Sequence, residues 1–361
     1  MNADDAGITA NGNGESNMEA GSPDELRRRH DGLVAAEPRL RIRDRASRLG
    51  VTEAELVAAD CGLESVELAG TPQEIFRSLG SLGRVMALSR NDWCVHERHG
   101  RYEDIQADGM VGVVLGPDID LRMFFGLWKY AYSVVENGRR SLQFFDREGN
   151  AVHKIYRTDE TDAAAWDALV KQFAAQRKSA VQVQPIGALV EKETVEDPQA
   201  FRSHWLGLKD THDFHPMLRK FQLSRLGALR CAGPDLAQQV GNDTCESMLT
   251  RVAKNGLAIM CFVANRGMVQ IHSGPVSRLA RTGPWFNVLD PNFNLHLDTE
   301  SISSTWIVNK PTSDGWVTSI EAYEPGGALV VQFFGARKPG QPELPAWREL
   351  LLGMCKTPLA A

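Results

Sequence analysis

Several features that would assign this 361-residue chain to a broad class are missing from its sequence. No apolar run approaches the roughly 18 residues of a membrane span, and the first residues lack the apolar core of a secretory signal. The net charge of -6 and the pI of about 5.9 do not fit the basic surface that non-specific nucleic-acid binding needs. We therefore expect a soluble cytoplasmic protein with no stable membrane insertion and no nucleic-acid partner.

Cysteine and phosphate-binding glycine motifs are scarce as well. The six cysteines are scattered along the chain and form no CxxC pair. A disulfide framework would be unusual in a chain of this length, so we expect free thiols in a reducing compartment. No glycine-rich loop follows a predicted strand, and nucleotide binding therefore has no support.

The chain repeats itself at a long period after a polar start. Residues 1–23 have almost nothing apolar to bury, which predicts a disordered tail. Thr52 begins a capping box with Glu55, in a helix that we expect to stop at Gly62, and Ser224 opens a similar helix. The matching pairs are Thr52 with Ser224, Leu121 with Phe293 and Met123 with Leu295 at an offset of 172, Ser141 with Ser319 at 178, and Trp166 with Trp347 at 181. Such a period indicates a duplicated domain, with repeats at 24–185 and 190–361 and a link near 183–195.

Within each repeat the order is helices, then strands, then one closing helix. Strand patterns lie at 84–88, 93–96, 110–115, 130–136, 141–145 and 152–156, and again at 258–264, 268–272, 293–297, 304–308, 316–323 and 329–334. Turn residues such as Asn137-Gly138 and Gly326-Gly327 separate neighbouring strands and suit hairpins. Consecutive hairpins with segregated helices predict an α+β fold, in which each half is a large antiparallel sheet with packed helices.

Two histidines, His212 and His215, stand three residues apart before a run of apolar residues at helical spacing. Pro216 confines them to the start of that helix, because proline is tolerated only in the first turn. Imidazole is the commonest metal ligand, so one reading is a ligand pair, and the other is a helix entry with two exposed histidines. At an offset of 172, the first repeat has Leu40 and Arg43 at these positions, which predicts one site per chain.

A second group, Cys94, His96 and His99, is close in sequence. On a strand, Cys94 and His96 would share a face and could form part of a zinc site, or a Cys–His hydrolase pair. An ordinary polar strand end explains the same residues and is the favoured interpretation, since three or four zinc ligands of defined spacing cannot be assembled.

Long motifs then give the chain a family resemblance. These are DTHDFHPMLRKFQLSRLGALRCAG, RNDWCVHERHGRYED, DIDLRMFFGLW, VQIHSGPV and FFGARKPGQPE. Together they resemble the cytoplasmic haemin-binding family of HemS, HmuS, ChuS and PhuS, over nearly all the chain from about residue 25. The resemblance implies two repeated α+β halves with haem, iron protoporphyrin IX, in a cleft between them.

The resemblance also implies roles for individual residues. His212 matches the proximal iron ligand, His215 a second histidine proposed to take the iron during transfer, and Arg122 the distal arginine, the one residue with a catalytic role. The remaining haem-binding matches are Phe124 and Phe262 on the ring and Lys310 and Arg337 at the propionates. Tyrosine in some members is replaced here by Phe333 and Phe334. By residue type alone, the phenylalanines would be core, Lys310 a turn lysine and Arg122 a surface arginine.

Two functions follow from the resemblance. The favoured one is a haem carrier that receives imported haem and passes it on for iron release, with a haem importer or a haem oxygenase as partners. The alternative is an O2-dependent haem-degrading monooxygenase with an external electron donor. A zinc-dependent or protein-binding module is a third, less favoured reading.

Overall fold

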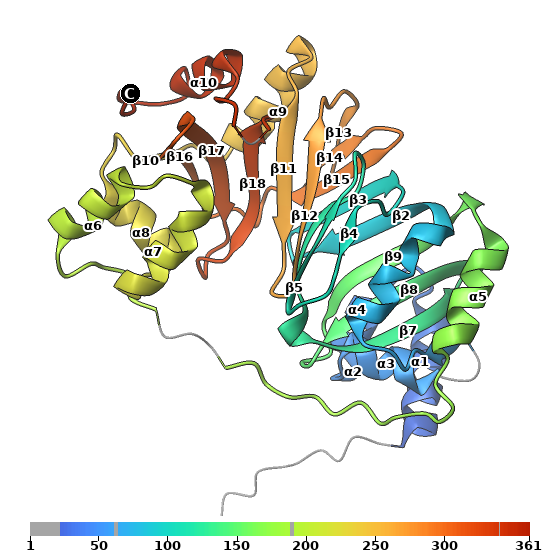
Figure 1. Cartoon of the computed structure of the whole chain (residues 1–361). Coiled ribbons are helices and arrows are strands. Elements are labelled where there is room, and N and C mark those ends of the chain that lie inside the picture. Colours follow the sequence, from blue (N-terminus) through green and yellow to red (C-terminus); the bar gives the residue numbers. More distant parts are fainter. Residues whose placement is uncertain (1–21, 61–63, 188–190, 339) are drawn as a thin grey trace, which may run out of the picture.

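The computed structural model describes residues 22–60, 64–187, 191–338 and 340–361, and it contains two nine-stranded antiparallel sheets (Figure 1). The first sheet has the order β1-β7-β8-β9-β2-β3-β15-β14-β13, and the second has the order β10-β16-β17-β18-β11-β12-β6-β5-β4. The two orders correspond strand by strand, as a duplication requires. The predicted α+β fold with duplicated antiparallel sheets is confirmed.

The elements have the following bounds. The first sheet contains β1 (Ser65–Glu67), β7 (Trp128–Glu136), β8 (Arg139–Asp146), β9 (Ala151–Thr161), β2 (Gly83–Arg90), β3 (Cys94–Gly100), β15 (Phe293–Asp298), β14 (Trp285–Leu289) and β13 (Leu279–Thr282). The second contains β10 (Ala237–Val240), β16 (Ser304–Thr312), β17 (Gly315–Tyr323), β18 (Leu329–Gly335), β11 (Ile259–Ala264), β12 (Met268–Gly274), β6 (Asp120–Phe124), β5 (Val111–Leu115) and β4 (Ile105–Gln106). The helices are α1 (Pro23–Ala36), α2 (Ile42–Leu49), α3 (Glu53–Ala59), α4 (Pro72–Arg77), η1 (Leu79–Leu82), η2 (Phe125–Leu127), α5 (Ala163–Phe173), α6 (Pro198–Leu206), η3 (Thr211–Asp213), α7 (Phe214–Phe221), α8 (Arg225–Ala232), α9 (Thr244–Asn255) and α10 (Pro345–Leu352).

Each sheet continues across the boundary between the two halves. Strand β15 of the second half pairs with β3 of the first, and β6 of the first half pairs with β12 of the second. The sequence predicted strands at twelve positions, all of which are strands here, but it did not predict β1, β4, β6, β10, β13 or β14. It therefore did not reveal that three strands of each half complete the sheet of the other half.

The strand register corrects one part of the predicted self-match. Arg122 lies opposite Val269 in β12, and His296 lies opposite Val95 in β3, where Val95 and Val269 hold the same place in their sheets. The offset in this region is therefore 174, and the predicted match at 172, which set Leu121 on Phe293, is wrong. An insertion of two residues between the helices and these strands explains the difference.

Elsewhere the self-match holds. Thr52 and Ser224 are both N-caps, and the capping box of Thr52 with Glu55 is present. Ser141 and Ser319 occupy the same register in β8 and β17, each two strands from the corresponding residue of β2 or β11. The expected helix stop at Gly62 and most of the predicted tail, residues 1–21, lie outside the described residues, and α1 already begins at Pro23.

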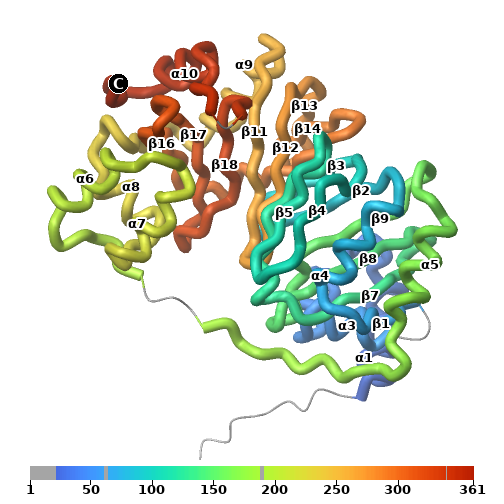
Figure 2. The backbone as a smooth tube through the Cα atoms, in the orientation of Figure 1, coloured from blue at the N-terminus to red at the C-terminus, as the bar shows by residue number. Residues whose placement is uncertain are grey.

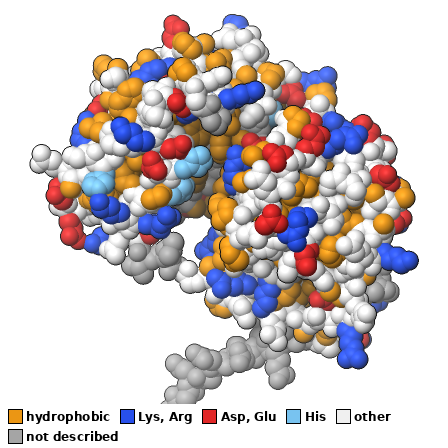
Figure 3. All heavy atoms as spheres, viewed as in Figure 1, with side chains coloured by type: hydrophobic (Ala, Val, Ile, Leu, Met, Phe, Trp, Pro, Cys, Tyr) orange, Lys and Arg blue, Asp and Glu red, His pale blue; other side chains and the backbone are white. Residues whose placement is uncertain are grey.

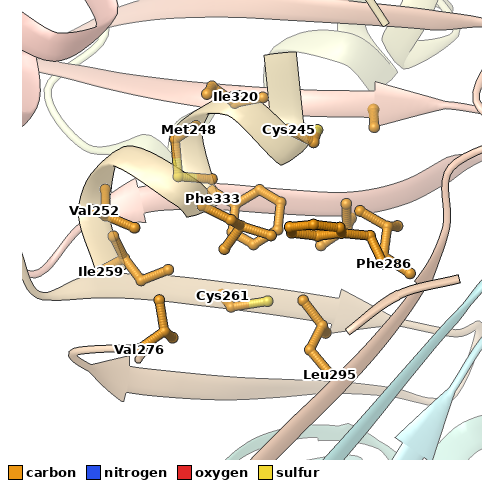
Figure 4. Close-up of a cluster of buried hydrophobic side chains, with 14 of the residues drawn as sticks. Cys245, Met248, Val252, Ile259, Cys261, Val276, Phe286, Leu295, Ile320 and Phe333 are labelled. Atoms are coloured by element: carbon orange, nitrogen blue, oxygen red, sulfur yellow. The ribbon is translucent and has the colours of Figure 1, made fainter. Parts of the chain in front are cut away.

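Each half has its own core, in which its own strands from both sheets enclose a helix. In the second half, α9 contributes Cys245, Met248 and Val252, which share a buried cluster with residues of β11 and β15 (Figure 4). The helices α6 to α8 form a separate layer against β16 and β17 (Figure 1). They cover one end of the second sheet, so the neighbouring face of β18, β11, β12 and β6 is left for other contacts.

Two asparagines at matching positions join the sheets. The amide of Asn91 donates hydrogen bonds to Ala264 O (3.2 Å) and Val330 O (2.8 Å), and the amide of Asn265 donates to Arg90 O (3.1 Å) and Val152 O (2.9 Å). Each side chain thus bonds backbone carbonyls of the opposite sheet, and the pair fixes how the halves meet.

The segment after α5 follows the outside of the molecule toward α6 (Figure 2). Gln182 and Gln184 hydrogen-bond to first-half residues, whereas Lys192 pairs with Gln222 and Ser224 of the second half.

In the described parts of the chain, no helix is long and apolar enough to cross a membrane.

Candidate functional site

One face of the second sheet gathers residues from both halves. In β6, Leu121 and Met123 are fully buried in the first-half core, so the alternating Asp120, Arg122 and Phe124 point to the opposite face. Arg122 lies opposite Val269, and the same face continues through β12 to Phe262 in β11. The sheet exchange thus places Arg122 and Phe124, from the first half, on the same face as Phe262, from the second.

Aromatic rings form the middle of this face. Phe262 lies opposite Gln332, and its ring meets the ring of Phe334 edge to face at 5.1 Å. Both phenylalanines are partly exposed, and Phe124 is 39% exposed, which is unusual for so large an apolar side chain. Their positions do not fit the core interpretation, because they leave an apolar floor open on the surface.

The histidine pair stands at the entry of α7, as the sequence predicted. His212 lies in η3, and His215 lies in the first turn of α7 before Pro216. Asp210 and Asp213 cap the short turn reciprocally. The amide of Ser313 donates to Lys209 O (2.8 Å), so the turn is also tied to the loop between β16 and β17.

His212 presents one free ring nitrogen to its surroundings. Its side chain is 87% exposed, and its Nδ1 donates to Asp210 Oδ1 at 2.6 Å. The hydrogen bonds from the His212 amide and ring lower the pKa of Asp210, so this carboxylate is ionised and acts as the acceptor. Because Nδ1 carries the proton, Nε2 carries the lone pair that a metal ligand needs.

His215 is a neutral imidazole at physiological pH. Its pKa falls to about 4, first because neighbouring protein atoms desolvate it and then because the positive charges of Arg225, Lys310 and Arg219 oppose its protonation. It is nevertheless exposed on the surface of α7. His215 can therefore offer an unprotonated nitrogen.

A buried charge cluster lies beneath this turn. Glu321, which is fully buried, accepts two hydrogen bonds from Arg225 (2.7 Å each) and one each from Lys310 (3.0 Å), Tyr323 (2.5 Å) and Gln332 (2.7 Å). Two cations share one carboxylate, so the cluster carries an excess positive charge. Burial, opposed by the charge of Glu321, lowers the pKa of Lys310 to about 8.

Phe214 separates Lys310 from the solvent. The Lys310 ammonium lies 4.4 Å from the centre of the Phe214 ring, and Arg225 lies on the same ring at 5.1 Å. Lys310 is only 2% exposed, so it is neither the solvated turn lysine of the alternative reading nor open to a ligand in this conformation.

The two remaining predicted residues are each held by an aspartate. Arg337 donates to Asp314 at 3.2 Å and is close enough to Asp210 to lower its pKa. Arg122 forms an ion pair with Asp120 on its own strand, and its side chain is 32% exposed. Among the described residues, no hydrogen bond or ring contact connects Arg122 or Phe124 with the histidine turn.

The surface is hollowed between the α6–α8 layer and the first half (Figure 3). Histidine atoms lie at the edge of this hollow, and basic side chains lie across it. The contacts and charges described above bring His212, His215, Lys310 and Arg337 together in the second half, with Phe262 and the first-half residues on the adjoining sheet face. The sequence analysis missed Asp210, Arg225 and Glu321, since only the fold brings Glu321 to α8.

The first half has a copy of this turn without the histidines. Helix α2 corresponds to α7 at the offset of 172, and Arg43 stands where the second half has His215. Arg43 pairs with Asp92, and Arg90 donates to the backbone of Asn91 and Asp92. Burial and the charge of Arg43 lower the pKa of Arg90. A guanidinium stays protonated and cannot bind a metal, so this copy has no ligand at the helix entry.

The group of Cys94, His96 and His99 does not form a metal or hydrolase site. Cys94 is fully buried, which raises its thiol pKa and keeps the thiol protonated. His96 is also fully buried, and burial lowers its pKa well below the usual value. Among the residues that the structure describes, no three His, Cys, Asp or Glu side chains could hold a metal ion together.

Comparisons with known proteins identify the family of the chain. The sequence model of the haemin-degrading HemS.ChuX domain matches residues 50–173 and 222–353. The hemin transport protein HmuS of Yersinia pestis is 37% identical over 332 residues, covering 91% of this chain and 96% of that protein.

Two solved structures are similar over almost their whole length. The structure of apo-PhuS, a heme-binding protein from Pseudomonas aeruginosa, has a TM-score of 0.89 and 44% identity, covering 92% of this chain and 99% of its own. The heme-degrading enzyme ChuS from Escherichia coli O157:H7 has a TM-score of 0.88 and 32% identity, with the same two coverages.

Proposed function

This chain belongs to the haemin-degrading HemS/ChuX family, and on that premise we propose that it is a haem carrier with His212 as the iron ligand. The observation that carries the proposal is the orientation of His212: the Asp210 carboxylate holds Nδ1 at 2.6 Å, the side chain is 87% exposed, and no hydrogen bond to Nε2 occurs among the described residues. A neutral imidazole with an open nitrogen is the usual protein ligand of haem iron.

The surroundings suit the rest of the haem. The porphyrin is a flat apolar disc, and the partly exposed rings of Phe262 and Phe124 offer an apolar surface for it. Its propionates are carboxylates, and Arg337 and the positive cluster of Arg225 and Lys310 would meet them as charge-assisted donors. Because Phe214 covers Lys310, we propose that the start of α7 moves when a propionate reaches the ammonium.

The paired histidines favour a carrier. His215 lies three residues from His212 and is neutral, so the iron can pass from one imidazole to the other before it leaves the protein. We propose that the chain acts in the cytoplasm, between a haem importer and a haem oxygenase or another acceptor. The names of its relatives include both roles: HmuS is a hemin transport protein, and ChuS is described as a heme oxygenase.

One observation favours the alternative, a haem-degrading enzyme. Arg122 lies on the open sheet face with a third of its side chain exposed, where its guanidinium could stabilise a water or an O2 molecule on the distal side of the haem. Such an enzyme would consume O2 and electrons from an external donor.

Haemin titration tests the ligand assignment. The wild-type chain should shift the Soret band with an end point at one haem per chain. His212→Ala should change the spectrum and weaken binding, and the His212→Ala/His215→Ala double variant should lose the ligated spectrum. His204→Ala, a histidine on α6 outside the turn, is the matched control. Unchanged spectra and affinities in the double variant would show that the ligand assignment is wrong.

A turnover experiment separates the two functions. The haem complex is reduced without oxygen and then exposed to O2, with catalase present to remove peroxide. Unchanged haem supports the carrier, whereas a defined bilin product that disappears in Arg122→Ala supports the enzyme.

A further inference from the structure

We propose that Asp210 is a positioning residue that makes His212 the stronger of the two haem ligands and so sets the order of haem hand-over. The inference rests on the proposed function, because it assumes that His212 and His215 both bind the iron. It concerns a difference between the two histidines that their spacing does not show.

Asp210 fixes both the position and the tautomer of His212. One oxygen, Oδ1, accepts from the His212 amide at 2.8 Å and from Nδ1 at 2.6 Å. The other carboxylate of the turn, Asp213, accepts from the amides of Asp210 (3.1 Å) and Lys209 (3.4 Å) and does not touch the ring. Both aspartates therefore cap the turn, but only Asp210 also holds the His212 imidazole.

A carboxylate behind a metal-binding histidine strengthens the metal bond. The negative charge makes the imidazole a better electron donor, and loss of such a partner typically costs about 10- to 100-fold in metal affinity. Asp210 is suited to this role, because a single oxygen, Oδ1, accepts from both the amide and the ring of His212 and so lies directly behind the imidazole. The pair is exposed in the free chain, and a bound haem would cover it and reduce its screening by water.

His215 has the opposite surroundings. No hydrogen bond to its ring occurs among the described residues, and its charged neighbours are mainly cations: Arg225, Lys310 and Arg219, with Glu321 as the opposing charge. Positive charge withdraws electron density from an imidazole, so His215 is the weaker donor. The haem should therefore rest on His212, and the form bound through His215 should be less stable and release haem more readily.

Resonance Raman spectroscopy of the reduced haem complex tests this difference, because the iron–histidine stretch reports the donor strength of the imidazole. Asp210→Asn keeps the oxygen that caps the turn and removes the charge. We expect it to lower the stretching frequency and to speed haem loss to an apomyoglobin trap by about 10- to 100-fold. Asp213→Asn is the matched control and should leave the frequency unchanged.

The His212→Ala background completes the test. There the haem should show the lower frequency of a His215 complex, and adding Asp210→Asn should have no further effect. The inference is overturned if Asp210→Asn leaves the frequency at the wild-type value while His212→Ala changes it, or if the effect of Asp210→Asn persists without His212. If His212→Ala also leaves the frequency unchanged, the ligand assignment itself has failed.

Discussion

Replacing Glu321 tests how strongly its negative charge stabilises the buried charge cluster. Glu321 is fully buried and is the carboxylate shared by Arg225 and Lys310, with further bonds from Tyr323 and Gln332. Glu321→Gln preserves the shape of the side chain but removes its charge, which leaves two buried cations beside each other. We expect a large loss of stability in the second half.

The magnitude follows from the charges. Breaking a buried ion pair by removing one partner costs about 3–5 kcal/mol, because the other charge stays buried without compensation. Lys310 reduces this cost, since its pKa is already about 8 and falls further without Glu321, so the lysine can lose its proton. Arg225 cannot do so. We therefore expect a decrease in the free energy of unfolding near the lower end, about 3 kcal/mol.

Urea unfolding followed by circular dichroism measures the difference. Glu349→Gln, on the exposed side of α10, is the matched control and should change stability by less than about 0.5 kcal/mol. Lys310→Met in the Glu321→Gln background should restore part of the loss by removing one cation. A Glu321→Gln variant as stable as the control would refute the reasoning.

The same cluster fixes the sign of a pH dependence. The cations beside Glu321 outweigh its burial and hold its folded pKa well below the usual value. The stabilisation of the fold by this carboxylate is therefore fully present above its unfolded pKa, near 4.5. It is lost as the pH falls below that value toward the folded pKa. The stability difference between the wild type and Glu321→Gln should therefore shrink in acid.

Three further predictions concern other parts of the chain. Haem affinity should be full below pH 8 and fall as the pH rises through the pKa of Lys310 in the haem-free chain, because a propionate favours the protonated ammonium. Haemin titrations from pH 7 to 10 check this, and Lys310→Met should lack the decrease in affinity. Asn91→Ala and Asn265→Ala should each lower the free energy of unfolding by about 1–3 kcal/mol in urea titrations, since each leaves two carbonyls of the opposite sheet without a donor. Iodoacetamide should label Cys231 before the fully buried Cys245, whose pKa is raised to about 12 by burial, as peptide mass spectrometry would show.

The sequence predicted what depends on local pattern. The capping box at Thr52, the helix entry at His212 and the duplicated order of strands all follow from residue types at fixed spacing, and the structure contains each of them. Strand β6 has an alternating pattern in Asp120–Phe124 that could have identified it as a strand. Its pairing with β12 could not be predicted, because a strand's pattern shows which face is buried but not which distant strand lies beside it.

The contacts within the candidate site could be predicted from the sequence even less than the strand pairing. The family resemblance selected Lys310 as a propionate-binding residue, which stays a prediction. No pattern in the sequence indicates that Glu321 and Phe214 enclose this lysine. The bond between Asp210 and His212 arises from the tight turn of η3, in which residues two apart can meet. Such contacts depend on backbone geometry that residue spacing alone does not specify.

The duplicated fold shows why we expect a haem ligand in the second half. Both halves place a helix entry over the corresponding end of a nine-stranded sheet, but the first half has Arg43 and the second has His215 at the same position. On the strand that crosses from the other half the two residue types are exchanged, with His296 in the first sheet and Arg122 at the corresponding position in the second. His296 is in turn bound through Nδ1 to Asn287 at 2.7 Å. Because, of these two matching positions, only the second half has a histidine at the helix entry and an arginine on the crossing strand, we expect one haem per chain.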